Sequence, residues 1–436
     1  MQVRVTLLLH KEWIVMRLLI QGMVLIVSIL PILVWPNDEI EPANELILQK
    51  YTDPALSAFV RTVVESNPRV QAARAALEAS RALESAAGRP IYNPELEADY
   101  ESAVDETWEI GIGQTFDWSG KRKAREQVAS SDRHASEAVY ETVRRNIAVD
   151  LLSGLAGFQT GKQRDSLAVE RVRIMKDFAE LAQRRFTAGD LTQVEADLAT
   201  LASIDAQIQR ATAAADLAEA TQSVRSLTLA TSADQWPTIN SDLPLAVMIS
   251  DPQRFVLNLP EIQVAQRRLD VANAAIDMRK TERKPDPTLS LRGGREDDST
   301  LVGINLSIPL YIRNNYKFEV SAAVAQRDQV QQIFDDQIRH AYARLLSASE
   351  RYQLSREAWE GWQRIGQASL QRQVDLLQRL WESGELSTTD YLVQLQQTLD
   401  TRWNALDLEL TMWDAWFEWL AATGLADNWL GLEKSP

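Results

Sequence analysis

The sequence contains no cysteine and few histidines, and these absences exclude several classes of protein. Without cysteine the chain has no disulfide bond, no thiol nucleophile, no thiolate metal site and no cysteine that could carry an N-terminal lipid. The histidines are His10, His134 and His340, and none of them has the spacing of a metal site. No phosphate-binding loop, dinucleotide fingerprint or catalytic triad is recognisable. We therefore expect no cofactor, no resident metal ion and no enzymatic activity.

The chain also lacks positive charge and, beyond its N-terminus, any long apolar run. Its formal net charge is -15, which argues against a nucleic-acid partner because phosphate contacts need a basic surface. No later apolar run approaches the roughly 20 residues that a membrane helix needs. If the mature chain crosses a membrane, it must do so with strands.

Basic residues and an apolar stretch stand together at the N-terminus. Arg4, Lys11 and Arg17 precede the apolar run 18–34, as in a secretory signal. We interpret residues 1–36 as a signal peptide for export. The alternative is a membrane anchor that is not cleaved.

Proline is scarce, and its distribution predicts long helices. Residues 95–236 and 310–435 contain none, and a helix interior excludes proline at a cost of about 3 kcal/mol. We predict long helices over 121–185 and 314–380, each followed by a turn at a glycine and a return helix that starts at Thr192 or Ser387.

The return helices carry apolar residues at coiled-coil spacing. From Leu392 to Trp413 these residues step by three and four, which predicts a packed seam. A weaker seam of the same kind is predicted in the first return helix, at Val194, Leu198, Leu201 and Ile208. The tryptophans near the C-terminus, Trp413, Trp416 and Trp419, are expected to pack between helices.

Four short segments alternate apolar with polar residues and predict strands. They lie at 95–101, 108–116, 289–292 and 302–308, with acidic loops at Ser102–Thr107 and Gly294–Thr300 between the members of each pair. One face is apolar and the other strongly charged, as in strands that surround a water-filled pore in a membrane. Four strands cannot close a barrel, and open edges are not tolerated in lipid, so a membrane location implies a homo-oligomer. The alternative is a pair of soluble hairpins that cap a helical bundle.

Landmarks recur along the chain with a shift of about 192 to 195 residues. Asn67-Pro68 corresponds to Leu259-Pro260, Asn93-Pro94 to Asp286-Pro287, and the segment 186–192 to 381–387. We predict a first repeat at 53–235, a linker at 236–257, a second repeat at 258–425 and a C-terminal tail at 426–436.

These ordered landmarks resemble the TolC family of outer-membrane efflux channels over almost the whole mature chain. The segment 116–122, FDWSGKR, is similar to the strand-to-helix junction of the CzcC-like branch, the outer component of heavy-metal efflux systems. The resemblance implies a mainly helical chain with a small β part: a homotrimer with a transmembrane barrel of about twelve strands and a long helical coiled-coil tunnel in the periplasm. It also implies two protein partners, a periplasmic adaptor (a membrane fusion protein) and an inner-membrane pump, for which the RND type is one candidate.

The resemblance assigns roles to the two helix–turn–helix tips. The tip residues expected to contact the adaptor are Gly189, Asp190, Leu191, Thr192, Gly384, Glu385, Leu386 and Ser387. Many members have Val-Gly-Leu there, whereas this chain has an acidic residue between Gly and Leu. Glu195 and Asp390 are expected to be the acids that narrow the entrance. The alternative is that both are ordinary first-turn acids, which the helix dipole favours.

A basic cluster follows the second predicted strand. Lys121, Arg122 and Lys123 stand at the start of a helix, where positive charge opposes the dipole, so another interaction must offset the cost. We predict that they anchor the chain to anionic lipid headgroups at the periplasmic face of the outer membrane. The alternative is a solvated helix face.

The sequence thus favours a passive exit duct for metal cations or small molecules, located in the outer membrane with a periplasmic helical extension. Two alternatives stay open: a periplasmic coiled-coil structural or adaptor protein with an uncleaved anchor, and a duct for secreted polypeptides.

Overall fold

Helices make up most of the protein, as the scarcity of proline predicts. The computed structural model describes residues 53–102, 106–228, 232–239, 244–245, 249–383 and 385–432. These residues all belong to one unit, Leu48–Pro436. The predicted signal peptide, residues 1–36, lies outside the described residues.

The helices fall into two groups, one before residue 228 and one from Pro252 onward, so the helix Pro252–Leu257 lies within the predicted linker 236–257. Those before it are α2 (Pro54–Ser66), α3 (Pro68–Ala87), α4 (Lys121–Ala188) and α5 (Gln193–Leu227). Those from Pro252 onward are α6 (Pro252–Leu257), α7 (Pro260–Glu282), α8 (Lys317–Gly361), α9 (Gln367–Glu382), α10 (Thr388–Thr423) and α11 (Ala426–Leu430), and a short 3-10 turn lies at Ala233–Gln235. None of the described helices combines the length and the apolar character that a bilayer crossing requires.

Several helices begin with the residues that favour a helix start. Proline occupies the first position of α2, α3, α6 and α7, where its missing N–H costs nothing. The carboxylates of Asp53 and Asp251 and the amide oxygen of Asn67 accept hydrogen bonds from first-turn N–H groups. These starts explain why the landmarks Asn67-Pro68 and Leu259-Pro260 open helices, whereas Pro94 and Pro287 precede strands.

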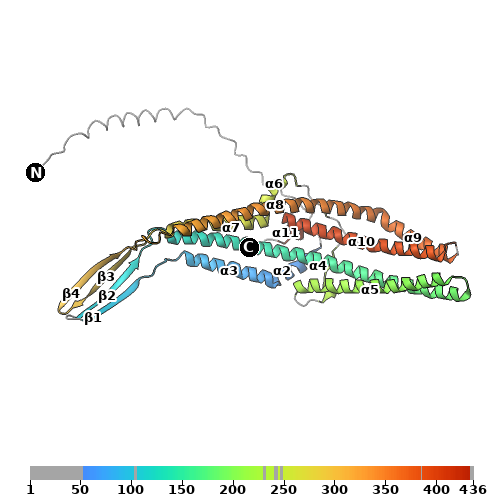
Figure 1. Cartoon of the computed structure of the whole chain (residues 1–436), viewed down its shortest axis with the longest axis horizontal. Coiled ribbons are helices and arrows are strands. Elements are labelled where there is room, and N and C mark those ends of the chain that lie inside the picture. Colours follow the sequence, from blue (N-terminus) through green and yellow to red (C-terminus); the bar gives the residue numbers. More distant parts are fainter. Residues whose placement is uncertain are drawn as a thin grey trace, which may run out of the picture. The chain divides into compact units, whose positions relative to one another are not determined.

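Helix α4 is continuous over its 68 residues. It runs from the sheet to the opposite end of the helices (Figure 1). It packs against α3 and α7 on the side of the sheet, and against α5 and α10 farther along. The predicted first long helix is therefore confirmed, and it extends slightly beyond residue 185.

The second long helix is interrupted, so the prediction of one unbroken helix over 314–380 is wrong. Helix α8 begins at Lys317, and a π-helical segment at Trp362–Gly366 separates it from α9. The Gln367 N–H donates to the Trp362 carbonyl, the hydrogen bond of a widened turn. A Cβ at Gly366 would lie 2.2 Å from Cε3 of Trp362, so glycine leaves the space that the indole ring fills.

The four strands form one antiparallel sheet in the order β1-β2-β3-β4. Their bounds are β1 (Glu95–Ser102), β2 (Glu106–Thr115), β3 (Thr288–Glu296) and β4 (Ser299–Ser307). Asp297 and Asp298 form the whole turn between β3 and β4, with Asp297 at a φ of 47°. The predicted loop Gly294–Thr300 is therefore too long, because its outer residues continue the strands.

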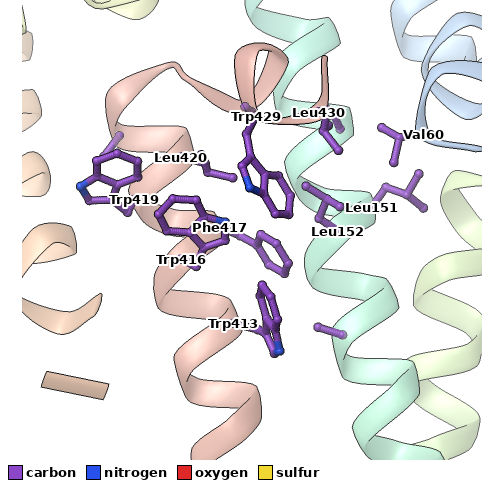
Figure 2. Close-up of a cluster of buried hydrophobic side chains, with 14 of the residues drawn as sticks. Val60, Leu151, Leu152, Trp413, Trp416, Phe417, Trp419, Leu420, Trp429 and Leu430 are labelled. Atoms are coloured by element: carbon purple, nitrogen blue, oxygen red, sulfur yellow. The ribbon is translucent and has the colours of Figure 1, made fainter. Parts of the chain in front are cut away.

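The largest apolar core lies where α10 and α11 meet α4. Figure 2 shows Trp413, Phe417 and Trp429 between α10 and Leu151 and Leu152 of α4. The rings of Trp416 and Trp419 are stacked with centroids 4.9 Å apart, and both side chains are fully buried. Packing of these tryptophans between helices is confirmed.

A second, smaller core holds the helices together near their tips. It joins Phe178 of α4, Ala199 of α5, Trp381 of α9 and Tyr391 of α10. The Trp381 and Tyr391 rings are stacked at 4.5 Å with an interplanar angle of 8°. Stacking across this turn fixes α9 against α10.

Candidate functional site

One face of the sheet is apolar and open. Leu96 is 80 % exposed, and Val302 and Ile304 are each 77 % exposed. The same face carries further half-exposed apolar side chains: Tyr100, Trp108, Ile110, Ile112, Leu289, Leu291 and Leu306. So large an exposed apolar patch on a folded chain marks a surface that lipid or protein covers.

The opposite face of the sheet is acidic. By register, and except for Glu106 at the end of the apolar face, it carries the acids of the described strands: Glu95, Glu97, Asp99, Glu101, Glu109 and Glu296. Arg292 of β3 is the basic side chain that the described strands place on this face. Water must reach a face with this many carboxylates, because a buried unpaired charge is costly.

Arg292 organises the acidic side chains around it. Its Nη2 lies 2.7 Å from Oε2 of Glu97, two strands away, and its Nη1 lies 3.6 Å from Oδ2 of Asp99 and 3.9 Å from Oε2 of Glu109. Gly111 stands between Arg292 and Glu97 in the register, and a Cβ there would lie 2.8 Å from Cγ of Arg292. Glycine therefore lets the arginine cross β2.

The sheet has two open edges. β1 pairs with β2 and β4 pairs with β3, and no other described strand pairs with either outer edge. Each edge presents a row of backbone N–H and C=O groups that can pair with another chain.

A buried ion pair joins the end of the sheet to α4. Lys121 Nζ lies 2.9 Å from Oδ2 of Asp286, whose side chain is 3 % exposed. The Tyr92 hydroxyl donates to the same carboxylate over 2.9 Å, and the Ser119 hydroxyl donates over 3.3 Å. Partial burial, followed by the hydrogen bond to Asp286, raises the pKa of Tyr92 to about 12.

The structure shows what offsets the positive charge at the start of α4. The Asp117 carboxylate accepts from the backbone N–H groups of Lys121 and Arg122 over 2.8 and 2.7 Å. Partial burial alone would raise the pKa of Asp117, but these hydrogen bonds, with another from Gly120, outweigh burial and lower it. A carboxylate at a helix N-terminus is favoured by the dipole.

The three residues of the predicted anchor have different surroundings. Lys121 faces Asp286, so its ammonium group is engaged within the junction. Arg122 Nη1 donates to the Gly88 carbonyl just beyond α3, and Arg125 donates to the carbonyls of Ala87 and Arg89. Lys123 is exposed and forms no ion pair with a described residue. Anchoring to headgroups stays a prediction, for which Lys123 is free.

The first tip is a tight turn between α4 and α5. Gly189 has a φ of 88°, which favours glycine, and its N–H donates to the carbonyls of Arg185 and Phe186. Asp190 and Leu191 follow, and Thr192 caps α5. These residues lie together at the end of the helices, as expected of a tip.

Glu195 and Thr192 form a capping box. The Glu195 N–H donates to the Thr192 hydroxyl, and the Thr192 N–H donates to Glu195 Oε2 over 2.9 Å. The backbone and side-chain hydrogen bonds from Thr192 lower the pKa of Glu195. The carboxylate is therefore charged at neutral pH and has a local structural role, while its entrance role stays a prediction.

The second tip repeats this arrangement. Ser387 caps α10, and its hydroxyl lies 2.7 Å from Oδ2 of Asp390 and accepts from the Asp390 N–H. The N–H groups of Glu385 and Leu386 donate to the Leu380 carbonyl. Gly384 lies outside the described residues.

The predicted seam of α5 is wrong as a packing surface within one chain. Val194 is 68 % and Leu201 61 % exposed, and Leu198, Ile204 and Ile208 are exposed with them. Helix α5 instead buries small residues on the side of α4: Ala196, Ala199, Ala202, Ala206 and Ala213. The apolar residues 194, 198, 201, 204 and 208, here called the α5 stripe, are left exposed by the described part of the chain.

The described residues contain no group of three or more His, Cys, Asp or Glu side chains arranged to hold a metal ion. Arg292 organises the polar face and Asp286 the junction, and neither was predicted from the sequence as a site residue. The only sequence signal was the glycine at position 111, because a glycine within a strand can mark a place where another group passes close to the backbone. No signal linked Asp286 to Lys121.

Comparison with known proteins gives a consistent set of relatives. A family model described as outer membrane efflux protein matches residues 60–228 and 252–425. The cobalt-zinc-cadmium resistance protein CzcC of Cupriavidus metallidurans is 25 % identical over 279 residues, covering 62 % of this chain and 66 % of that protein. The nickel-cobalt-cadmium resistance protein NccC of Alcaligenes xylosoxydans xylosoxydans is 25 % identical over 229 residues, covering 50 % and 52 %. The chain thus spans about half to two thirds of the length of these relatives.

Among solved structures, the CmeC outer membrane channel of Campylobacter jejuni matches with a TM-score of 0.71. The match covers 85 % of each chain at 16 % identity, so it shows a shared fold.

Proposed function

The chain belongs to the outer membrane efflux protein family, and we propose that it is the passive outer-membrane duct of a tripartite efflux system. It is not an enzyme, because its family is that of outer membrane efflux proteins and the fold neighbour CmeC is an outer membrane channel. Energy for export is then supplied by an inner-membrane pump, for which the RND type is one candidate, through a periplasmic adaptor.

The open sheet is the observation that carries this proposal. An apolar face, an acidic face and two unpaired edges suit strands that face lipid outside and water inside, and such edges must be paired in a bilayer. Pairing β4 of one copy with β1 of the next removes both edges. Three copies, the number that resemblance to the TolC family implies, then close a barrel of about twelve strands.

The order of elements supports an internal duplication. A helix, two strands, a long helix and a return helix occur as α3 to α5 and again as α7 to α10. The two stretches that match the family model have similar lengths. We propose repeats at 53–235 and 258–425.

The α5 stripe supports a helical tunnel built from several copies. Its residues keep coiled-coil spacing but meet water in the single chain. In the proposed homotrimer, the stripe packs against a helix of the neighbouring copy. The family tips, with Glu195 and Asp390 at the entrance, then face the adaptor.

Metal cations are the cargo that the charges favour. The acidic face lines the pore of the proposed barrel, and clustered carboxylates raise the local concentration of cations. The names of CzcC and NccC connect those relatives with resistance to cobalt, cadmium, zinc and nickel.

Cysteine cross-linking tests the assembly directly, because the natural chain has no cysteine. One cysteine in β1, at Leu96, Ala98 or Tyr100, is combined with one in β4, at Val302, Ile304 or Leu306, and treated with a short bifunctional maleimide. We expect covalent dimers and trimers but no larger species. In the control, Ala98→Cys with Ile110→Cys, the residues face each other within one sheet and should give cross-linked monomers.

Purified protein in a planar bilayer tests the function. We expect cation-selective conductance from the heat-resistant oligomer. A monodisperse monomer that remains soluble without detergent would instead support the periplasmic structural protein.

A further inference from the structure

Four connecting segments meet at the helix-side end of the sheet, and two of them carry exposed apolar side chains. Ile312 and Phe318 are each 82 % exposed, and Leu310, Trp118 and Phe116 are also open. Phe116 continues the alternation of β2, and Leu310 that of β4, on the side of the apolar face. The Phe116 N–H donates to the Pro287 carbonyl, so this alternation continues past the strand end. The apolar face therefore extends beyond the strands.

Exposed cations stand among these apolar residues. Lys284 lies between α7 and β3, Arg313 lies between β4 and α8, and Lys317 begins α8. None of the three forms an ion pair with a described residue, although the whole chain carries a net charge of -15. The Arg283 guanidinium donates to the Asn315 carbonyl and so ties the two connections together.

Four acids in or beside these connections are engaged with internal partners, while Glu95, at the same end of β1, lies on the acidic face of the sheet. Asp286 pairs with Lys121, and Asp117 caps α4. Glu282 lies 2.8 Å from Arg279, and Glu319 accepts from the Asn314 amide over 3.5 Å. The junction therefore presents its positive charges outward and holds these four negative charges in internal contacts.

We propose that this collar, defined by Phe116, Trp118, Lys284, Leu310, Ile312, Arg313, Lys317 and Phe318, is a binding surface for anionic phospholipid. The proposal rests on the proposed membrane function and adds the lipid class that the junction selects. Leu310, Ile312 and Phe318 enter the acyl region beside the strands, as aromatic and apolar residues do at a barrel rim. Lys284, Arg313 and Lys317 meet the phosphate groups.

The collar differs from the anchor that the sequence predicts. Lys121 contacts Asp286 and Arg122 contacts the end of α3, whereas the collar cations Lys284, Arg313 and Lys317 all come from the second half of the chain. The collar combines exposed cations with apolar residues that continue the apolar face of the sheet. An anionic phospholipid matches both features at once, with its phosphate and its acyl chains, whereas a protein partner would require only one of them.

Lipid retention tests the proposal on the full chain. The oligomer is reconstituted in nanodiscs containing equal amounts of phosphatidylglycerol and phosphatidylethanolamine, and the lipids that stay bound are counted by native mass spectrometry. We expect enrichment of phosphatidylglycerol, which falls as salt rises. In the triple variant Lys284→Gln, Arg313→Gln, Lys317→Gln the enrichment should drop by about fivefold for each removed charge, since a cation near an anionic surface contributes about 1 kcal/mol.

Matched variants separate this effect from a general loss of charge. The control Arg81→Gln, Lys176→Gln, Arg339→Gln removes three exposed cations from α3, α4 and α8 and should keep the enrichment. Leu310→Ser with Ile312→Ser should reduce retention of both lipids alike. Excess glycerol phosphate should not displace the lipid, because the apolar contacts are part of the site.

Equal retention of both lipids by the natural chain, or the same enrichment in the triple variant, overturns the proposal. Conductance and heat-resistant oligomers are measured in parallel on every variant. If these persist while the lipid preference is absent, the collar assignment fails and the channel proposal stands. If the natural chain neither conducts nor forms oligomers, the channel proposal itself fails.

Discussion

Arg292 of β3 pairs with Glu97 of β1 across the intervening strand, with 2.7 Å between Nη2 and Oε2. The crossing is possible because Gly111 lies beneath the arginine side chain. The glycine at position 111 of β2 thus allows the arginine of β3 to reach the glutamate of β1.

Replacing Gly111 should therefore disturb this face. Gly111→Ala places a Cβ 2.8 Å from Cγ of Arg292 and should cost about 1–3 kcal/mol of stability, as overpacking does. Gly303→Ala is the matched control, because Gly303 lies in the same row and has open space around it. Chemical unfolding of both variants gives the comparison, and an equal loss in both would show that the crossing is unimportant.

The buried ion pair at the junction should contribute more to the free energy of unfolding than the exposed charges beside it. Lys121→Met leaves the Asp286 carboxylate buried without its counter-ion and should cost about 3–5 kcal/mol. Lys123→Met removes an exposed lysine from the same helical turn and should change the free energy of unfolding by less than about 0.5 kcal/mol. Denaturant titrations of the two variants test this difference.

Tyr92 should make stability depend on alkaline pH. Its pKa is raised from 10.0 to about 12 by burial and by the Asp286 carboxylate, so unfolding releases its proton between these values. The stabilising contribution is complete below pH 10 and decreases as pH rises toward 12. Unfolding measured over this range should show a steeper decline in the natural chain than in Tyr92→Phe. Parallel pH profiles would contradict the assignment.

The tip acids can be tested so that charge and capping are separated. Glu195→Gln with Asp390→Asn removes both charges but keeps side chains that can hydrogen-bond at the same positions, whereas Glu195→Ala with Asp390→Ala removes both properties. If the acids line the entrance, both double variants should lower cation selectivity in single-channel recordings. If the acids serve only as caps, the amide variant should behave as the natural chain does.

Two glycines at the π-helical segment Trp362–Gly366 provide another pair of matched variants. Gly366→Ala forces the Trp362 ring to move and should destabilise the chain, while Gly361→Ala has open space and should stabilise the helix by up to about 1 kcal/mol. Thermal unfolding of both variants measures the contrast. Equal shifts would show that the ring does not depend on Gly366.

Periodicity and proline positions were enough to predict the long helices and the strands, but not the break at Trp362–Gly366. The long α4, the four strands and the helical packing of Trp416 all follow from local spacing. Pairing between distant segments was not predictable, because no local pattern states that Asp286 meets Lys121 or that Arg292 crosses Gly111.

The α5 stripe shows a different limit. The spacing of Leu198 and Leu201 predicts a packing surface, yet both side chains are exposed in the single chain, so their burial against another copy stays a proposal. Alanines were less conspicuous in the sequence, yet Ala199 and Ala206 are the residues that α5 buries in the single chain.

The two halves of the chain differ in one mechanical respect. Helix α4 has no joint between Lys121 and Ala188, so a push at its tip acts as on a stiff lever of roughly 100 Å and is felt where the strands begin. The corresponding rod in the second half has an elbow at Trp362–Gly366. A force transmitted along α9 can therefore be taken up by bending at this elbow, which lies between the second tip and β4.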